Sequence, residues 1–307
     1  MKISVIVPAF NEEKLLGASL AEIKSAAAAF AARGWGFELV VCDNNSTDRT
    51  AEIARAAGAK VVFEPVNQIG RARNSGAAAA TGDWLVFVDA DTHPGAELFA
   101  EAAEKISSGK ILAGGVTIRL DEKLFAATLV TELWNYASRF KKLMAGSFIF
   151  VEAAAFRKIG GFNHEFFAAE ELDLSLRLKK LARADGRKIC ILHRHPIKTS
   201  ARKMKLYSAR EMGGFFLRSL FSPRKTLRNR EAAFMWYDGR CKWDRRLACR
   251  VSMTNNLQTA ANGNSTGETP VPLRCAKTAA VIFEGVIRGL NYFFASAQIF
   301  FCWRWTN

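Results

Sequence analysis

The chain has 307 residues, of which half are hydrophobic, 24% charged and 11% aromatic, and its formal net charge is +15. This composition is sufficient for a buried core and excludes a disordered, collagen-like or coiled-coil chain. The six cysteines form no C-x-x-C pair, so neither a disulfide framework nor a zinc knuckle is indicated, and a reducing, cytoplasmic compartment is expected.

Short β-branched runs alternate with helix-like patterns through the first 110 residues. The predicted strands are ISVIVP, FELVVC, KVVF and DWLVFV, and the predicted helices cover about 12–33, about 48–57 and the residues after Gly70. This alternation predicts an α/β fold with a mostly parallel, Rossmann-like sheet that carries helices on both faces. Ligands of such sheets bind at the carboxyl ends of the strands, and polar clusters occur there at 11–12, 43–48 and 89–91.

Residues 111–192 follow without a linker, so the sequence predicts a single domain over 1–192. The second half of that domain contains the strand-like runs ILAGGVTIRL and SFIFVEAAAF and predicted helices at about 123–141 and 168–184. Both kinds of element continue the mixed α/β pattern of the first half.

The residues after this domain carry most of the net charge. Residues 193–250 contain 16 basic and 4 acidic side chains, whereas residues 1–192 contain 24 and 23. Arginines and aromatic side chains interleave in 193–250, which predicts a basic, amphipathic helical extension that contacts an anionic membrane surface. The composition of 251–278 indicates a flexible linker, and the apolar residues 279–307 predict a buried or interfacial helix, because charged residues interrupt them too often for a span.

Two carboxylates one residue apart, Asp89 and Asp91, follow the fourth predicted strand. Such a pair is costly to hold together unless a cation or hydrogen-bond donors neutralise it. Oxygen ligands with room for a diphosphate suit Mg²⁺ or Mn²⁺. The alternative is an aspartate that only ends the strand and caps the next helix.

Asp43 lies directly at the tip of the second predicted strand, before a run of small polar residues. Ser46 or Thr47 is predicted to cap the following helix, and Asp48 in the first turn suits the helix dipole. Capping of this helix explains Ser46, Thr47 and Asp48 but leaves Asp43 unexplained. Asp43 is therefore a candidate binding residue.

Arg71, Arg73 and Asn74 lie at the start of the helix after Gly70, near the sheet edge that Asp43 occupies. A solvated helix face is the alternative for either arginine alone. Together they are candidates for ion-pair partners of the acidic strand tips or for contacts to phosphate and base.

Three acids, Glu170, Glu171 and Asp173, crowd the start of a predicted helix. Acidic residues in a first helical turn are favourable without any function. Three within four positions exceed what capping requires, and their crowding raises the pKa of at least one carboxyl, as a general base needs.

The clusters VIVPAFNEE, CDNNSTD, GRARNSG, ATGD and DAD, in this order and spacing, resemble the family 2 glycosyltransferases, which have the GT-A fold. The resemblance covers about residues 1–192. It implies an enzyme that transfers a sugar from a nucleotide-diphosphate sugar to an acceptor hydroxyl with inversion and with a divalent metal. It also implies a donor half at about 1–110, an acceptor half at about 111–192 and UDP as the default nucleotide.

The resemblance assigns roles to individual residues. The implied donor-binding residues are Pro8, Ala9, Phe10, Glu12, Asp43, Asn45, Arg71, Asn74, Asp89 and Ala90. The implied metal ligands are Asp91, Asp89 and His195, the last of which follows the strand-like run KICIL; a structural histidine is the alternative. The family's base lies in a Glu-Asp pair where this chain has Glu170-Glu171, so the base is Glu171 or, as second choice, Glu170, and Asp173 is a structural acid.

Two other functions compete with this interpretation. A sugar-phosphate nucleotidyltransferase would carry a glycine-rich loop after the first strand, where this chain has Pro8-Ala9-Phe10-Asn11-Glu12. A non-enzymatic basic protein on the same fold would bind membrane or nucleic acid, but no nucleic-acid motif is present, so no nucleic-acid partner is expected. We expect a cytoplasmic enzyme, peripheral on the inner face of the cell membrane, with a lipid-linked or envelope glycan as acceptor.

Overall fold

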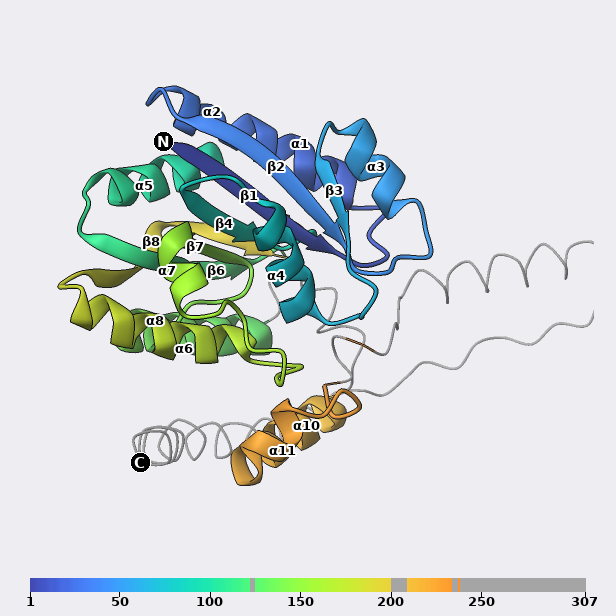
Figure 1. Ribbon diagram of the computed structural model, residues 1–307. Helices are drawn as coiled ribbons and strands as arrows, with labels where there is room; N and C mark the ends of the chain where they lie inside the picture. The colour runs from blue at the N-terminus through green and yellow to red at the C-terminus, as the bar shows by residue number, and fades with distance from the viewer. Residues whose placement is uncertain (122–124, 200–208, 234–236, 238–307) are drawn as a thin grey trace, which may run out of the picture. The chain divides into compact units, whose positions relative to one another are not determined.

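The computed structural model describes residues 1–121, 125–199, 209–233 and 237. The chain divides into two units, Met1–Met204 with Leu227–Arg230, and Lys205–Thr226 with Glu231–Asn307. The first unit contains an eight-stranded sheet in the order β3-β2-β1-β4-β7-β6-β8-β5, with helices on both of its faces (Figure 1).

The first four strands of the chain pair in parallel and form one side of the sheet. They are β1 (Lys2–Ala9), β2 (Gly36–Asp43), β3 (Lys60–Phe63) and β4 (Trp84–Val88). The connections are made by α1 (Leu16–Ala26), α2 (Ala28–Ala31), α3 (Thr50–Ala56) and α4 (Ile69–Ala79). Because every connection returns the chain to the same end of the sheet, the carboxyl ends of these strands lie along one edge.

The other half of the sheet mixes directions. It consists of β5 (Thr92–His93), β6 (Ile111–Leu120), β7 (Phe148–Glu152) and β8 (Lys188–Thr199). β7 runs antiparallel to both β4 and β6, β8 is parallel to β6, and the short β5 is antiparallel to β8. Of seven strand pairings, four are parallel, so the predicted α/β fold with a mostly parallel sheet is confirmed, with the antiparallel pairings confined to this half.

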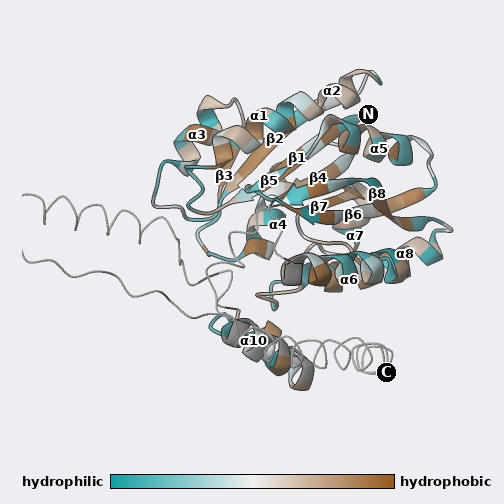
Figure 2. Cartoon of the chain, turned by 180° about the vertical axis from the view of Figure 1, so that it is seen from behind, coloured by the Kyte–Doolittle hydropathy of each residue, from teal (hydrophilic) through white to brown (hydrophobic). Residues whose placement is uncertain are grey.

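Two hydrophobic cores lie on opposite faces of the sheet. Along β1, Ile3, Val5 and Val7 belong to one core and Ile6 to the other, as the two-residue period of a strand requires. The first core includes residues of α1, α2, α3 and α5 (Ala96–Ser107). The second includes residues of α4, α7 (Ala153–Lys158) and α8 (Glu170–Ala184), and Figure 2 shows the apolar strands between these layers.

The helix α6 (Phe125–Lys141) is tied to the sheet by one side chain. The amide of Asn135 accepts a hydrogen bond from the Ile118 N–H and donates one to the Ile118 carbonyl, both at 2.9 Å. Ile118 is still paired with Ile197 of β8, but the pairing of β6 with β7 ends at Gly115, so the Asn135 side chain supplies backbone hydrogen bonds to β6 beyond the end of β7.

The strand β8 continues past the expected domain boundary at Leu192, so residues 193–199 are strand and not part of a helical extension. Within the predicted extension, α10 (Ala209–Phe221) and α11 (Pro223–Leu227) are helices. The predicted linker at 251–278 and the predicted apolar helix at 279–307 lie outside the described residues. Among the described helices, none has the length and apolar character needed to cross a membrane.

Candidate active site

The guanidinium of Arg73, on α4, joins three separate parts of the first unit. Nη1 donates to Oε1 of Glu170 at 2.7 Å, and Nη2 donates to Oδ1 of Asp89 at 2.8 Å. Nη2 also donates to the carbonyl of Gly146 at 3.2 Å. The end of β4, the turn before β7 and the first residue of α8 therefore meet at one side chain, of which 2% is exposed.

Burial of an arginine is tolerable only because carboxylates and a carbonyl surround it. Burial alone lowers the pKa of Arg73, but the Asp89 and Glu170 carboxylates outweigh that effect and raise the pKa above its ordinary value. The ring of Phe162 lies 5.2 Å from the guanidinium carbon. A Cβ at Gly146 would lie 2.9 Å from Nη2, so only glycine leaves room for the guanidinium at that turn.

Glu170 and Glu171 begin α8 after Ala169, which has a left-handed backbone with φ of 61°. Glu170 is buried; burial raises its pKa, and Arg73 opposes that rise. Glu171 is half-buried, and burial followed by the charge of Glu170 raises its pKa to about 8. The two adjacent glutamates thus have different surroundings, because Glu170 is bound to Arg73 while Glu171 has a carboxyl suited to accept a proton near neutral pH.

Asp173, the third acid of the cluster, accepts a hydrogen bond from Nε of Arg177 at 2.7 Å, one turn further along α8. This pair gives Asp173 the structural role expected of it.

Asp89 and Asp91 lie at the turn between β4 and β5. The carbonyl of Asp89 accepts hydrogen bonds from the N–H and the hydroxyl of Thr92, at 3.1 and 2.7 Å, which fixes the turn around the buried Ala90. Within the described residues, no group of three or more His, Cys, Asp or Glu side chains could hold a metal ion. The donor set still fits Mg²⁺ or Mn²⁺, because such ions are commonly held by one or two carboxylates together with substrate phosphate oxygens.

Asp43 is buried at the end of β2, paired in register with Ala9 at the end of β1. Its Oδ1 accepts a hydrogen bond from the Ser46 N–H at 3.0 Å. The adjacent Asn45 is exposed and has a left-handed backbone with φ of 66°. The Asp43 carboxylate is therefore held at the strand tip by its own loop, as a turn-forming aspartate often is.

Asn11 connects the loop after β1 to the loop after β2. Its backbone N–H donates to Oγ of Ser46 at 3.0 Å, and its Oδ1 accepts from the Thr47 N–H at 2.8 Å. These bonds bring the residues after β1 beside Asp43. The expected donor-binding residues at this edge are the buried Pro8 and Ala9, the half-buried Phe10 and Glu12, and Asp43 with Asn45.

The cap of α3 differs from the prediction. The N-cap residue is Arg49, whose side chain makes no capping hydrogen bond, and Oδ1 of Asp48, one residue earlier, accepts a hydrogen bond from the Thr50 N–H at 2.9 Å. Ser46 and Thr47, the predicted caps, bond to Asn11 instead. The prediction was wrong because their bonding partners belong to a loop distant in sequence.

Arg71 and Asn74 lie on α4 beside the loop at 161–168. Nε of Arg71 donates to Oε1 of Gln68 at 3.0 Å. The Asn74 amide donates to the Phe162 carbonyl at 2.8 Å and accepts from the Phe162 N–H at 2.9 Å. Asn74 thus holds this loop, a role that the sequence did not suggest.

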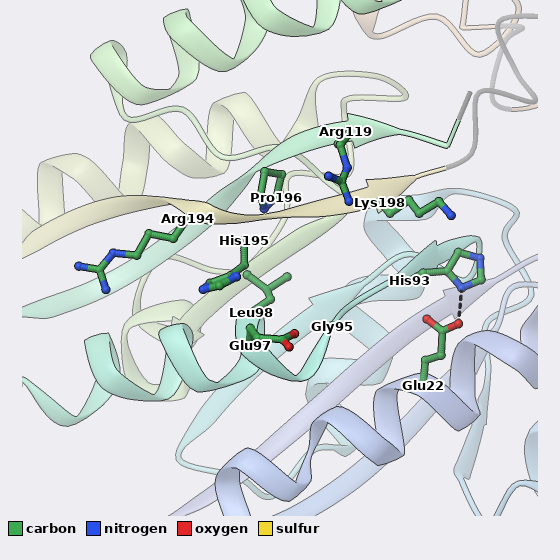
Figure 3. Close-up of a pocket in the computed structure, with 10 residues that line it drawn as sticks. All are labelled: Glu22, His93, Gly95, Glu97, Leu98, Arg119, Arg194, His195, Pro196 and Lys198. Carbon is green, nitrogen blue, oxygen red and sulfur yellow. Dashed lines mark ion pairs between the residues drawn. The ribbon is translucent and has the colours of Figure 1, made fainter. Parts of the chain in front are cut away.

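His195 lies in a cavity of about 540 Å³ that neither Asp89 nor Asp91 lines. Figure 3 shows its ring directed toward Leu98 of α5, with His93 and Glu22 paired at 3.1 Å elsewhere in the same cavity. The physical cause is a bulge: four residues separate the paired positions of β8 where one residue separates those of β6. The structure does not bring His195 together with Asp91, and this placement does not support His195 as a ligand of the same metal.

Sequence reasoning named Arg73 as a candidate but did not find its bridging role, and it missed Gly146 and Gln68 altogether. The spacing of small residues around Arg73 does indicate that this arginine is buried. Gly70, Arg73 and Ala77 share one face of α4 at i, i+3 and i+7, and all three are buried or nearly so. An arginine on a face of small residues indicates a buried arginine that requires acidic partners.

The family model of Glycosyl transferase family 2 matches residues 4–159, just over half of the chain. The chain belongs to glycosyl transferase family 2. An uncharacterized glycosyltransferase of Mycobacterium bovis is 35% identical over 113 residues, which are 37% of this chain and 47% of that protein. The dolichol-phosphate mannosyltransferase of Pyrococcus furiosus is 33% identical over 123 residues, 38% of this chain and 33% of that protein. The matched residues thus cover about half, or less, of the length of these curated relatives.

Solved structures support the fold of this family 2 glycosyl transferase. The mannosyltransferase PcManGT from Pyrobaculum calidifontis, in complex with GDP-Man and Mn²⁺, superposes with a TM-score of 0.57 at 17% identity, over 98% of this chain and 87% of that one. S. aureus TarS superposes with a TM-score of 0.52 at 22% identity, over 71% of this chain and 40% of that one. The expected GT-A fold is confirmed.

Proposed function

We propose that this family 2 glycosyl transferase moves a sugar from a nucleotide-diphosphate sugar to an acceptor hydroxyl with inversion at the anomeric carbon. The observation that carries the proposal is the double ion pair of Arg73 with Asp89 and Glu170. Because one guanidinium spans only a few bonds, the carboxylate at the tip of β4 and the glutamate pair of α8 lie within reach of a single bound sugar.

Glu171 is the proposed base. Its deprotonated carboxylate takes the proton of the acceptor hydroxyl while that oxygen attacks the anomeric carbon and the bond to the diphosphate breaks. Attack opposite to the leaving group inverts the anomeric configuration. Glu170 is less suited to this role, since Arg73 binds its carboxylate and only 5% of its side chain is exposed.

The joined loops after β1 and β2 are the proposed nucleoside site. The Asp43 carboxylate lies at the shared edge of these strands, next to the loop that carries Phe10 and Glu12. Arg71 of α4 is proposed to contact the nucleoside as well. UDP is the proposed nucleotide by family resemblance. Proteins of similar fold bind different nucleotides, since PcManGT was crystallised with GDP-Man and S. aureus TarS with UDP-GlcNAc.

Asp91, together with Asp89, is the proposed protein contribution to a divalent metal site. When bound there, Mg²⁺ or Mn²⁺ supplies positive charge to the departing diphosphate. The Asp89 carboxylate also accepts a hydrogen bond from Arg73. Asp91 is the main proposed ligand by family resemblance.

A binding and transfer screen across nucleotide sugars tests the proposal, with and without Mn²⁺. Glu171→Gln should keep donor binding and lose transfer by about a hundredfold or more, as loss of a general base does. Asp91→Ala should lose the binding that depends on the metal. Glu132→Gln, an exposed glutamate of α6, is the matched control and should behave as the wild type. Full transfer by Glu171→Gln would remove Glu171 from its role.

We also propose a peripheral contact with the anionic inner face of the cell membrane, where a lipid-linked or envelope acceptor would be reached. The described part of the basic extension supports it, because α10 exposes Leu217 and Phe221, at 55% and 79%, beside the exposed Arg218. Flotation with anionic vesicles should recover the wild type and less of the double variant Leu217→Ser, Phe221→Ser. Equal recovery with neutral vesicles would contradict an electrostatic contact.

A further inference from the structure

The loop that leads into the glutamate pair is held by residues about sixty positions further along the chain. Leu227–Arg230 belongs to the same unit as this loop. The Leu227 carbonyl accepts hydrogen bonds from the N–H groups of Phe167 and Ala168, at 2.8 and 3.3 Å. Two consecutive amides thus share one acceptor, immediately before Ala169 and Glu170.

Arg228 adds a side-chain contact to the same loop. Its Nη2 lies 2.7 Å from Oε2 of Glu165, and its guanidinium carbon lies 5.3 Å from the centre of the Phe166 ring. The ion pair is half-exposed, so its contribution is modest on its own. In combination with the backbone bonds, it fixes both the position and the direction of the segment.

The opposite side of the loop is held by Gln68, which precedes α4 and is buried. Its Nε2 donates to the carbonyls of His164 and Phe166, at 2.7 and 2.8 Å. Its Oε1 accepts from Nε of Arg71 at 3.0 Å. The loop is therefore held between Gln68 and the segment at 227–228.

The chain needs this support at its next residue. Ala169 adopts a left-handed backbone, which a residue with a Cβ adopts only where its surroundings impose it. The direction of the first turn of α8, and so the positions of Glu170 and Glu171, follow from that residue.

We propose that Leu227 and Arg228 form a brace that positions the glutamate pair for catalysis. They are positioning residues, since they act through the loop at 165–169 and touch neither substrate nor base. The inference rests on the proposed function, because the position of Glu171 matters for transfer only if Glu171 is the base. It gives part of the basic extension, which the sequence assigned to membrane contact, a positioning role for the active site.

Amide hydrogen exchange in the full-length protein tests the brace independently of activity. In Arg228→Gln, exchange of the Phe167 and Ala168 amides should accelerate about fivefold, the effect expected for loss of one half-exposed ion pair. Lys225→Gln removes an exposed charge three residues before Arg228 and should leave these amides unchanged. Unchanged exchange in Arg228→Gln would overturn the brace.

Kinetics test the positioning role. Arg228→Gln should lower kcat about fivefold and leave the KM for the donor sugar unchanged, because a displaced base weakens chemistry without weakening donor binding. The charge-reversed double variant, Glu165→Arg with Arg228→Glu, should recover most of both the exchange protection and kcat.

The remaining outcomes separate the two claims. Faster exchange in Arg228→Gln with unchanged kcat would mean that the brace holds the loop without positioning the base, which overturns the proposal. Faster exchange with no transfer by the wild type on any nucleotide sugar would overturn the proposed function and leave the brace standing. Failure of the double variant to recover exchange protection would overturn the pairing of Glu165 with Arg228.

Discussion

The two halves of the sheet build their parts of the site in different ways. In the parallel half, the ends of β1 and β2 meet at one edge because each connection returns the chain to it, so Ala9 and Asp43 are neighbours by topology alone. In the mixed half, Glu170 is joined to the end of β4 through Arg73, which is 97 positions earlier in the chain. The parallel half depends on strand ends, whereas the other depends on a buried ion pair.

The largest expected effect comes from breaking the ion pairs of Arg73. Arg73→Met leaves the buried Glu170 carboxylate without its partner, which should destabilise the fold by about 3–5 kcal/mol. Transfer should be abolished even where the variant remains folded. Denaturant unfolding and kcat on the folded fraction measure the two effects.

The control is Arg71→Gln, on the same helix but half-buried and without an ion pair among the described contacts. Its free energy of unfolding should change by less than about 1 kcal/mol. The loss of Arg71 should instead raise the KM for the donor sugar. Equal destabilisation by both variants would show that the loss at Arg73 does not come from its buried ion pairs.

Gly146→Ala should have the next largest effect on stability. The added Cβ would lie 2.9 Å from Nη2 of Arg73, so the guanidinium or the turn must move, at a cost of about 1–3 kcal/mol. Gly213→Ala, within α10 and with no atom within 4 Å of the new Cβ, is the matched control. It should be neutral or slightly stabilising, as an alanine in a helix is. Thermal unfolding of both variants would show the difference.

The pH dependence should report Glu171. Since the pKa of its carboxyl is raised to about 8, the active deprotonated base forms as the pH rises, and kcat/KM should increase roughly tenfold per pH unit below that value. In Glu171→Gln, the residual kcat/KM should no longer rise with pH in this range. A profile that is flat between pH 6 and 8 in the wild type would contradict the assignment.

The raised pKa of Glu171 also makes the stability of the fold depend on pH. Stability falls as the pH rises, whereas activity increases. The folded state keeps a proton on Glu171 that the unfolded chain has lost above about pH 4.5, so stability falls as the pH rises from there to about 8. Glu171→Gln removes that penalty and should be more stable than the wild type at pH 8. At pH 4 the two proteins should be similar, which urea unfolding at both pH values can check.

The smallest effect is expected in the parallel half. Asp48→Ala removes the side-chain acceptors of the Thr50 N–H and of the Glu13 N–H and should cost about 1 kcal/mol, a cost like that of losing a side-chain acceptor at a helix start. Thr47→Ala, at the residue predicted as a cap, should cost less, because its backbone N–H and not its hydroxyl makes the shorter bond to Asn11. Thermal unfolding of the two variants compares them.

The sequence was informative wherever a residue's role follows from its own element. The alternation of strands and helices predicted the parallel half, and Asp43, Asp89 and Asp91 were found as polar residues at strand ends. The caps of α3 and the place of His195 could not be found in this way. Ser46 and Thr47 bond to a loop 35 or 36 positions away, and His195 is displaced by a bulge that has no counterpart in the local pattern.

The sequence by itself determined the fold class, the family and the carboxylates at the ends of the strands, because periodicity and strand-end chemistry are local properties of the chain. Only the tertiary structure decided which acids share a site, which glutamate is bound to Arg73, and that Leu227 and Arg228 hold the loop before Glu170. The reason is that burial and ion pairing depend on what surrounds a side chain, and those surroundings come from residues far apart in the sequence.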